Sequence, residues 1–210
     1  MLKKILIGLA VAVVAFLGFV ATRPTDSHIE RSATAKAPPD VVFANINSLE
    51  RFVQWSPWQG LDPTQKVTFS GEKAGVGAKY AWEGNDEVGK GRMEIIDSKP
   101  NERIQENLEF IEPFASKAVV TIALAPDGDG TKITWGFDTK NDFMGKLFGI
   151  FVDMDAMLGK DFDKGLASLA ALSEKQAADK KAAEAAAPVA APAAPADGAT
   201  PPAATPPAKD

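Results

Sequence analysis

Apolar and polar residues alternate through most of the segment from Asp26 to Lys140, and this pattern constrains the fold more than any other feature of the chain. A period of two is typical of strands that bury one face and expose the other. The pattern predicts six or seven strands, namely His28 to Lys36, Val67 to Ser70, Lys79 to Glu83, Gly89 to Ser98, Arg103 to Phe110, Lys117 to Ala125 and Thr131 to Lys140. Gly, Pro, Asn and Asp fill the breaks between them, so short turns should join antiparallel neighbours.

Helical patterns lie on both sides of this predicted meander. Two prolines open a short helix within residues 37–46, and a second short helix is predicted from Leu49 to Trp55. From Phe143 to Leu172 apolar residues recur at steps of three or four, which predicts one long amphipathic helix or two in tandem. Its expected weak points are Gly149, Gly159 and Gly165. These elements predict an α+β fold, in which a curved antiparallel sheet wraps around the long C-terminal helix.

The stretch from Ile5 to Thr22 contains 18 consecutive uncharged and mainly apolar residues. As a helix it would extend about 27 Å, close to the ~30 Å hydrocarbon core of a bilayer. We expect a membrane anchor within residues 1–25. A cleaved signal peptide is the alternative, but bulky Phe19 stands two positions before Ala21, where a cleavage site needs a small residue. Basic residues precede the stretch, which favours a cytoplasmic N-terminus and a domain on the opposite side.

The C-terminal segment has a different composition, with 16 Ala and 7 Pro among the 34 residues from Ala177 to Asp210. Such a segment supplies no large apolar side chains for a core, so we expect a disordered tail over residues 176–210. Its first part, to Ala187, is rich in Ala, Lys and Glu and could prolong the preceding helix until Pro188 stops it. Residues 26–175 remain as one predicted domain.

Composition excludes several classes of site. The chain has no cysteine and a single histidine, His28, which removes thiol nucleophiles, histidine-based triads and multi-histidine metal sites. We therefore predict no metal and no cofactor.

The net charge is −5, while the N-terminal 25 residues carry +3 and the tail −1, which leaves about −7 on the domain. An acidic domain is poorly suited to a phosphate backbone, so no nucleic-acid partner is expected.

Glu106 is the clearest local anomaly in the strand pattern. Ile104, Leu108 and Phe110 set the apolar phase of their strand, and Glu106 falls in the same phase. A buried carboxyl group there would have a raised pKa and could act as a general acid or base, or as a polar anchor for a ligand. A glutamate paired with a basic or backbone donor, or exposed at a sheet edge, remains the alternative interpretation.

Several segments, in this order along the chain, resemble one protein family. They are residues 37–43 (APPDVVF), 55–58 (WSPW), 75–85 (GVGAKYAWEGN), 89–93 (GKGRM) and 159–166 (GKDFDKGL). Together they are similar to the polyketide cyclase/dehydrase-related branch of the SRPBCC, or START-like, superfamily, over about Ile29 to Leu172. The resemblance implies a helix-grip fold in which the sheet encloses a cavity against the C-terminal helix. Members of this superfamily include lipid carriers and aromatic cyclases, so the fold does not fix the function.

The resemblance and the inward positions of bulky residues together give a predicted ligand-binding set. Its members share an inward phase on strands or helices, although aromatic and methionine residues more often fill cores. They are Trp55, Trp58, Trp82, Met93, Glu106, Phe110, Trp135, Met154 and Leu158.

Three functions remain open from the sequence. The leading hypothesis is a membrane-anchored binding module that holds a lipid or another apolar small molecule, without catalysis. It would stand in the bacterial inner membrane as a single-pass protein, with its domain facing the periplasm or the cell exterior. The second is a cyclase-like, dehydratase-like or hydrolytic enzyme that uses Glu106, with Arg92 stabilising an oxyanion. The third is an envelope adaptor that acts through its tail or its outer face.

Overall fold

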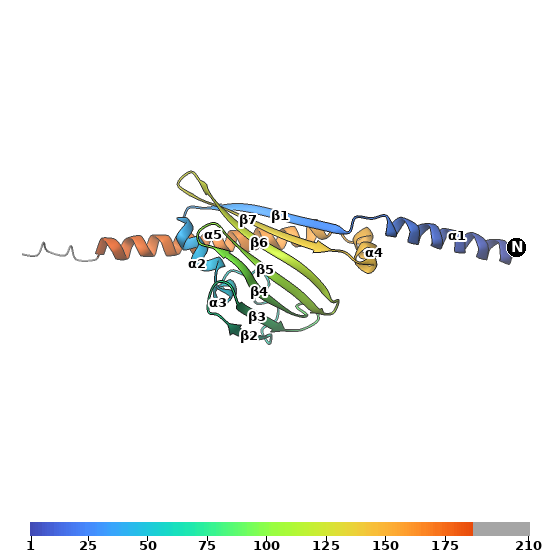
Figure 1. Ribbon diagram of the computed structural model, residues 1–210, viewed down its shortest axis with the longest axis horizontal. Coiled ribbons are helices and arrows are strands. Elements are labelled where there is room, and N and C mark those ends of the chain that lie inside the picture. Colours follow the sequence, from blue (N-terminus) through green and yellow to red (C-terminus); the bar gives the residue numbers. More distant parts are fainter. Residues whose placement is uncertain (187–210) are drawn as a thin grey trace, which may run out of the picture.

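A seven-stranded antiparallel sheet forms the middle of the protein in a computed structural model, which describes residues 1–186 (Figure 1). The strands are β1 (Asp26–Ala35), β2 (Lys66–Gly71), β3 (Ala78–Glu83), β4 (Lys90–Lys99), β5 (Arg103–Glu112), β6 (Ser116–Asp127) and β7 (Gly130–Lys140). Their spatial order is β1-β7-β6-β5-β4-β3-β2, so β2 to β7 form a continuous meander and β1 closes the edge beside β7. The sheet predicted from the period-two alternation is confirmed.

Five helices accompany the sheet within the described residues. They are α1 (Leu2–Ala21), α2 (Pro39–Ile46), α3 (Leu49–Phe52), α4 (Phe143–Phe151) and α5 (Met154–Ala186). Pro39 takes one of the first positions of α2, where its missing N–H is not needed. The Asp142 carboxylate caps α4, since it accepts a hydrogen bond from the Gly145 backbone N–H at 2.8 Å. The second short helix is one turn shorter than predicted, so Trp55 follows it in a loop.

The C-terminal helical region consists of two helices rather than one. α4 ends at Phe151, where Val152 adopts an extended conformation with φ −122°, and α5 begins at Met154. α5 is continuous through Gly159 and Gly165, and it extends to Ala186, past the predicted domain boundary at residue 175. Residues 176–186 of the predicted disordered tail (176–210) thus continue α5, as their Ala, Lys and Glu content allowed, and the rest of the tail lies outside the described residues.

The hydrophobic core lies between the inner face of the sheet and the helices α2, α3 and α5. α5 packs along β1 and β7 through a stripe of buried residues at helical spacing, with Phe162, Leu166 and Leu169 each at most 1% exposed. The α+β helix-grip arrangement predicted from the sequence is thereby confirmed. α1 projects away from one end of the sheet (Figure 1), and its apolar side chains are exposed except for Val20.

Candidate functional site

Glu106 is buried on the inner face of the sheet, as the strand phase predicts. Only 4% of the residue is exposed, and its partners on the neighbouring strands are Ile95 of β4 and Val120 of β6. Burial alone raises the pKa of the Glu106 carboxyl to about 8. A carboxylate in an apolar environment loses its hydration, so the neutral form is favoured. At neutral pH this side chain is mainly a carboxylic acid, able to donate one hydrogen bond and to accept others.

An aromatic cluster connects the sheet to α5. The rings of Trp135 and Phe162 stack with centroids 4.3 Å apart, and Trp55 and Trp58 contact Trp135 edge-on at 5.3 and 5.9 Å. Trp58 donates its indole N–H to Asp161 Oδ2 at 3.2 Å, and Trp55 donates to the Asn45 carbonyl at 3.3 Å. The buried Trp135 indole N–H has no acceptor within residues 1–186. The cluster therefore includes one unsatisfied donor that faces the interior.

A second aromatic cluster lies across β3, β4 and β5. Trp82 stacks on Tyr80 at 5.6 Å and contacts Phe110 edge-on at 5.9 Å. Its indole N–H donates to the Val88 carbonyl at 3.2 Å. Gly91 on β4 leaves the room that the Trp82 ring occupies, because a Cβ atom at this position would collide with that ring. Met93 is buried two residues further along β4.

The remaining two residues of the predicted set come from α5. Leu158 is half-buried and packs against the core, whereas Met154 lies at the first residue of the helix with 36% of its surface exposed. The structure thus brings Trp55, Trp58, Trp82, Met93, Glu106, Phe110, Trp135 and Leu158 to the interior or its border. Met154 lies apart from them because α5 begins there, at the exposed end of the helix.

Arg92 does not lie where the enzyme hypothesis places it. It is exposed on the outer face of the sheet, where its Nε donates to Glu109 Oε2 at 2.7 Å. Because Met93 points inward, its neighbour Arg92 must point outward. An oxyanion in the interior is therefore outside the reach of Arg92. The alternation of the strand in the sequence already indicates this, because it places Arg92 on the face opposite to Met93.

Sequence reasoning missed two polar contacts that position α5. Arg31 of β1 crosses over Gly159 and donates to Asp155 Oδ2 at 2.9 Å, and a Cβ atom on Gly159 would collide with the guanidinium. Buried Asn45 of α2 donates from Nδ2 to Ser173 Oγ at 3.1 Å and to Gln176 Oε1 at 2.7 Å. In each of these hydrogen bonds the donor and acceptor residues lie more than 120 positions apart in the sequence, so no local pattern predicts either contact.

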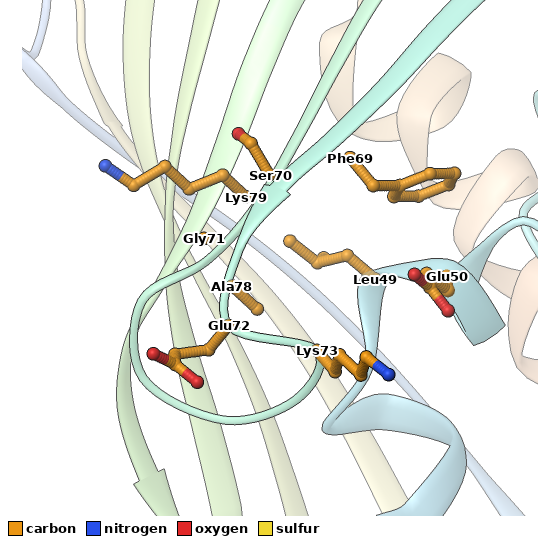
Figure 2. A pocket seen from close by; sticks show the side chains of 9 residues that line it. All are labelled: Leu49, Glu50, Phe69, Ser70, Gly71, Glu72, Lys73, Ala78 and Lys79. Atoms are coloured by element: carbon orange, nitrogen blue, oxygen red, sulfur yellow. The ribbon is translucent and has the colours of Figure 1, made fainter.

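Two pockets lie outside the interior. Figure 2 shows a pocket between α3 and the β2–β3 edge, lined by Leu49, Phe69 and several charged side chains. Its volume is about 90 Å³. A volume of this size holds only a few water molecules. The second, of about 560 Å³, is on the outer face of the sheet and is lined by His28, Asn107, Val119 and Asp138, among others. Neither pocket includes Glu106.

His28 belongs to this outer face, as an exposed residue. Its Nδ1 lies 2.7 Å from Asp138 Oδ1, and the hydrogen bond to Asp138 is the main reason that the pKa of His28 is raised. More than half of each side chain is exposed. The pair joins β1 to β7 but does not contribute to the interior. Within residues 1–186, no cluster of His, Asp and Glu has the arrangement of a metal site.

Comparison with known proteins supports the fold seen here. A protein from Rhizobium leguminosarum superposes with a TM-score of 0.53 at 19% identity, covering 71% of this chain and 95% of its own. A protein from Chromobacterium violaceum gives a TM-score of 0.52 at 20% identity, with 70% and 96% covered. One from Rhizobium loti gives 0.52 at 21% identity, also with 70% and 96% covered. At such identities the likeness shows the fold alone.

None of the curated protein sequences matches this chain. The model of one family, described as polyketide cyclase / dehydrase and lipid transport, matches residues 26–174. The match spans every strand of the sheet and most of α5, including Glu106 and both aromatic clusters. The chain therefore belongs to the polyketide cyclase/dehydrase and lipid transport family.

Proposed function

We propose that this protein is a membrane-anchored binding module whose interior, between the sheet and α5, accommodates a lipid or another apolar small molecule. The observation that carries the proposal is the buried carboxyl group of Glu106. Burial of a polar group without a compensating hydrogen bond costs about 1–3 kcal/mol in proteins. A ligand with a hydroxyl, ester or carboxyl group beside Glu106 would recover that energy.

The unsatisfied N–H of Trp135 supports the same interpretation. Buried polar atoms nearly always have partners, and this N–H has none within residues 1–186. Together with the buried Glu106 carboxyl group, it suits a ligand with a small polar end and a larger apolar part. The aromatic clusters on either side offer apolar contact surface. Phe110 and Leu158 are half-buried at the border of the interior, and their displacement would admit the ligand.

The proposed anchor is α1. It is long and apolar enough to cross a membrane, a property that a signal sequence near the N-terminus shares. Lys3 and Lys4 precede the apolar stretch, so the positive-inside tendency favours a cytoplasmic N-terminus. With this orientation the binding domain stands outside the cytoplasm, next to the bacterial inner membrane. A ligand drawn from that bilayer would have a short path to the domain.

The test is native mass spectrometry with lipid extraction on the full chain, purified from membranes in mild detergent. We expect an apolar molecule at one copy per chain. Glu106→Leu should reduce its occupancy, whereas Glu109→Leu, on the outer face of the same strand, should leave it unchanged. Equal occupancy in both variants would contradict the role of Glu106, and a chain that is empty in every variant would contradict the binding function.

The pKa of Glu106, about 8, favours one second candidate, an enzyme of the cyclase, dehydratase or hydrolase type. A carboxyl group that titrates near neutral pH is suited to general acid or base catalysis. Here Glu106 would transfer a proton to or from a bound substrate. Chemical conversion of the extracted ligand by the wild-type chain, and loss of the conversion in Glu106→Gln with binding retained, would support this candidate. Unchanged conversion in the variant would exclude Glu106 as the acid or base.

A further inference from the structure

α4 is an apolar helix without a buried residue. Its sequence, FMGKLFGIF, carries a single charge at Lys146. Its largest side chains are exposed to solvent in this structure, with 64% of Met144, 52% of Phe148 and 74% of Phe151 accessible. A helix with apolar residues around most of its circumference is normally buried in a core or in a membrane. The folded domain covers α4 on only part of its surface. Another apolar environment, outside this domain, should therefore cover the rest.

Neighbouring segments extend this exposed apolar surface. Phe114, in the β5–β6 turn, is 76% exposed, and its ring centroid lies 6.5 Å from that of Phe148. The first turn of α5 adds Met154 and Met157. We call the combined area the α4 surface, and its members are Phe114, Phe143, Met144, Phe148, Phe151, Met154 and Met157. Exposed apolar patches of this kind mark sites of protein or membrane contact.

The position of α1 identifies what covers the α4 surface. α4 contacts the end of α1, and Val20, in the last turn of α1, is fully buried. Only four residues, 22–25, separate α1 from the start of β1. Figure 1 shows α4 beside the end of α1, at the same end of the sheet. If α1 spans the bilayer, α4 therefore lies at the level of the membrane surface.

We propose that the α4 surface inserts into the lipid headgroup and acyl boundary of the membrane that α1 crosses. This inference rests on the proposed anchoring through α1, and it adds a second contact between domain and bilayer. Phe and Leu side chains on the apolar face of an interfacial helix enter the boundary between headgroups and acyl chains, and the exposed Phe and Met side chains of α4 suit such an insertion. Asp142 and Asp153 flank α4 and remain at its solvated ends. The two contacts together fix the orientation of the sheet relative to the membrane.

The absence of cysteine from the sequence allows a direct test with single-cysteine variants of the full chain. Phe148→Cys and Phe114→Cys report on the α4 surface, and Val11→Cys reports on α1. Asp129→Cys, in the β6–β7 turn at the opposite end of the sheet (Figure 1), is the matched control. Each variant is labelled with an environment-sensitive fluorophore and reconstituted in vesicles of phosphatidylethanolamine and phosphatidylglycerol, with or without lipid that carries a nitroxide on its acyl chain.

We expect the nitroxide lipid to quench the labels at positions 11, 114 and 148 and to leave the label at position 129 unchanged. Quenching at position 11 without quenching at 114 and 148 would overturn the inference while the anchor stands. If position 11 is not quenched either, the anchor fails and the inference fails with it. A label at position 148 that escapes the nitroxide, together with crosslinking of two unlabelled Phe148→Cys chains by a bifunctional maleimide, would also overturn it, in favour of a second copy as the occupant.

Discussion

The indole of Trp135 lies flat on the ring of Phe162, with centroids 4.3 Å apart and ring planes at 1° to each other. The stack joins β7 to α5, and both residues are almost fully buried. It is one of the contacts through which the C-terminal helix closes over the inner face of the sheet, beside the packing of α5 along β1. Removal of either ring should therefore loosen the attachment of α5 and open the interior that we propose as the ligand site.

Phe162→Ala should lower the free energy of unfolding by about 3–5 kcal/mol, the usual cost of truncating a buried aromatic residue. Urea denaturation of the full chain in mild detergent, followed by tryptophan fluorescence, measures the change. Phe148→Ala removes the same ring from the exposed surface of α4 and should cost little in detergent. Equal losses in the two variants would argue against a structural role of the Trp135–Phe162 stack in holding α5 on the sheet.

Gly165→Ala should destabilise the protein although alanine favours helices. A Cβ atom at Gly165 would lie 2.7 Å from the Trp135 ring and 3.1 Å from Pro57. This overlap should outweigh the helix-propensity gain of about 1 kcal/mol. Gly149→Ala is the matched control, since its Cβ atom would meet nothing within 4 Å and should stabilise α4. Thermal unfolding of both variants gives the comparison, and a more stable Gly165→Ala would disprove the predicted overlap.

Glu106→Gln should remove most of the dependence of stability on pH between about 4.5 and 8. Burial raises the pKa of Glu106 from 4.5 to about 8, so between these values the folded state binds a proton that the unfolded state releases. The stability from this proton is complete below pH 4.5 and is lost as pH rises toward 8. A shift of this size corresponds to a loss of roughly 5 kcal/mol at pH 9.

The measurement is urea denaturation of wild-type and Glu106→Gln chains at pH 5, 7 and 9. Wild type should become less stable over this series, and the variant should change much less because the amide does not titrate. The same pH slope in both chains would mean that Glu106 is not buried as described. Glu109→Gln, on the outer face, is the control for a general effect of charge removal.

Asn45→Ala should cost about 1–3 kcal/mol, because it leaves the buried hydroxyl of Ser173 without its donor and removes the bond to Gln176. The loss should appear first in the C-terminal half of α5, as faster amide hydrogen exchange near Ser173. Ser168→Ala, on the exposed side of α5, is the control and should leave exchange unchanged. Uniform acceleration over the whole chain would point to global destabilisation instead.

Much of the fold could be predicted from the sequence because strand phase is a local property. Apolar alternation determined that Glu106 shares a face with Ile104 and Leu108, and the structure buries all three. The same phase placed Trp82, Met93 and Trp135 on the inner face. Helical spacing likewise identified Phe162, Leu166 and Leu169 as one stripe. Each of these predictions depends only on residues a few positions apart.

The tertiary structure alone decided which partners these faces meet. Apolar spacing continues from Phe143 to Leu172, yet α5 enters the core while α4 leaves its apolar side chains exposed beside α1. The contacts of Arg31 with Asp155, of Asn45 with Ser173 and of Gly165 with Trp135 join distant segments. Periodicity reports which side of an element is apolar, but what covers that side depends on the packing of the whole chain.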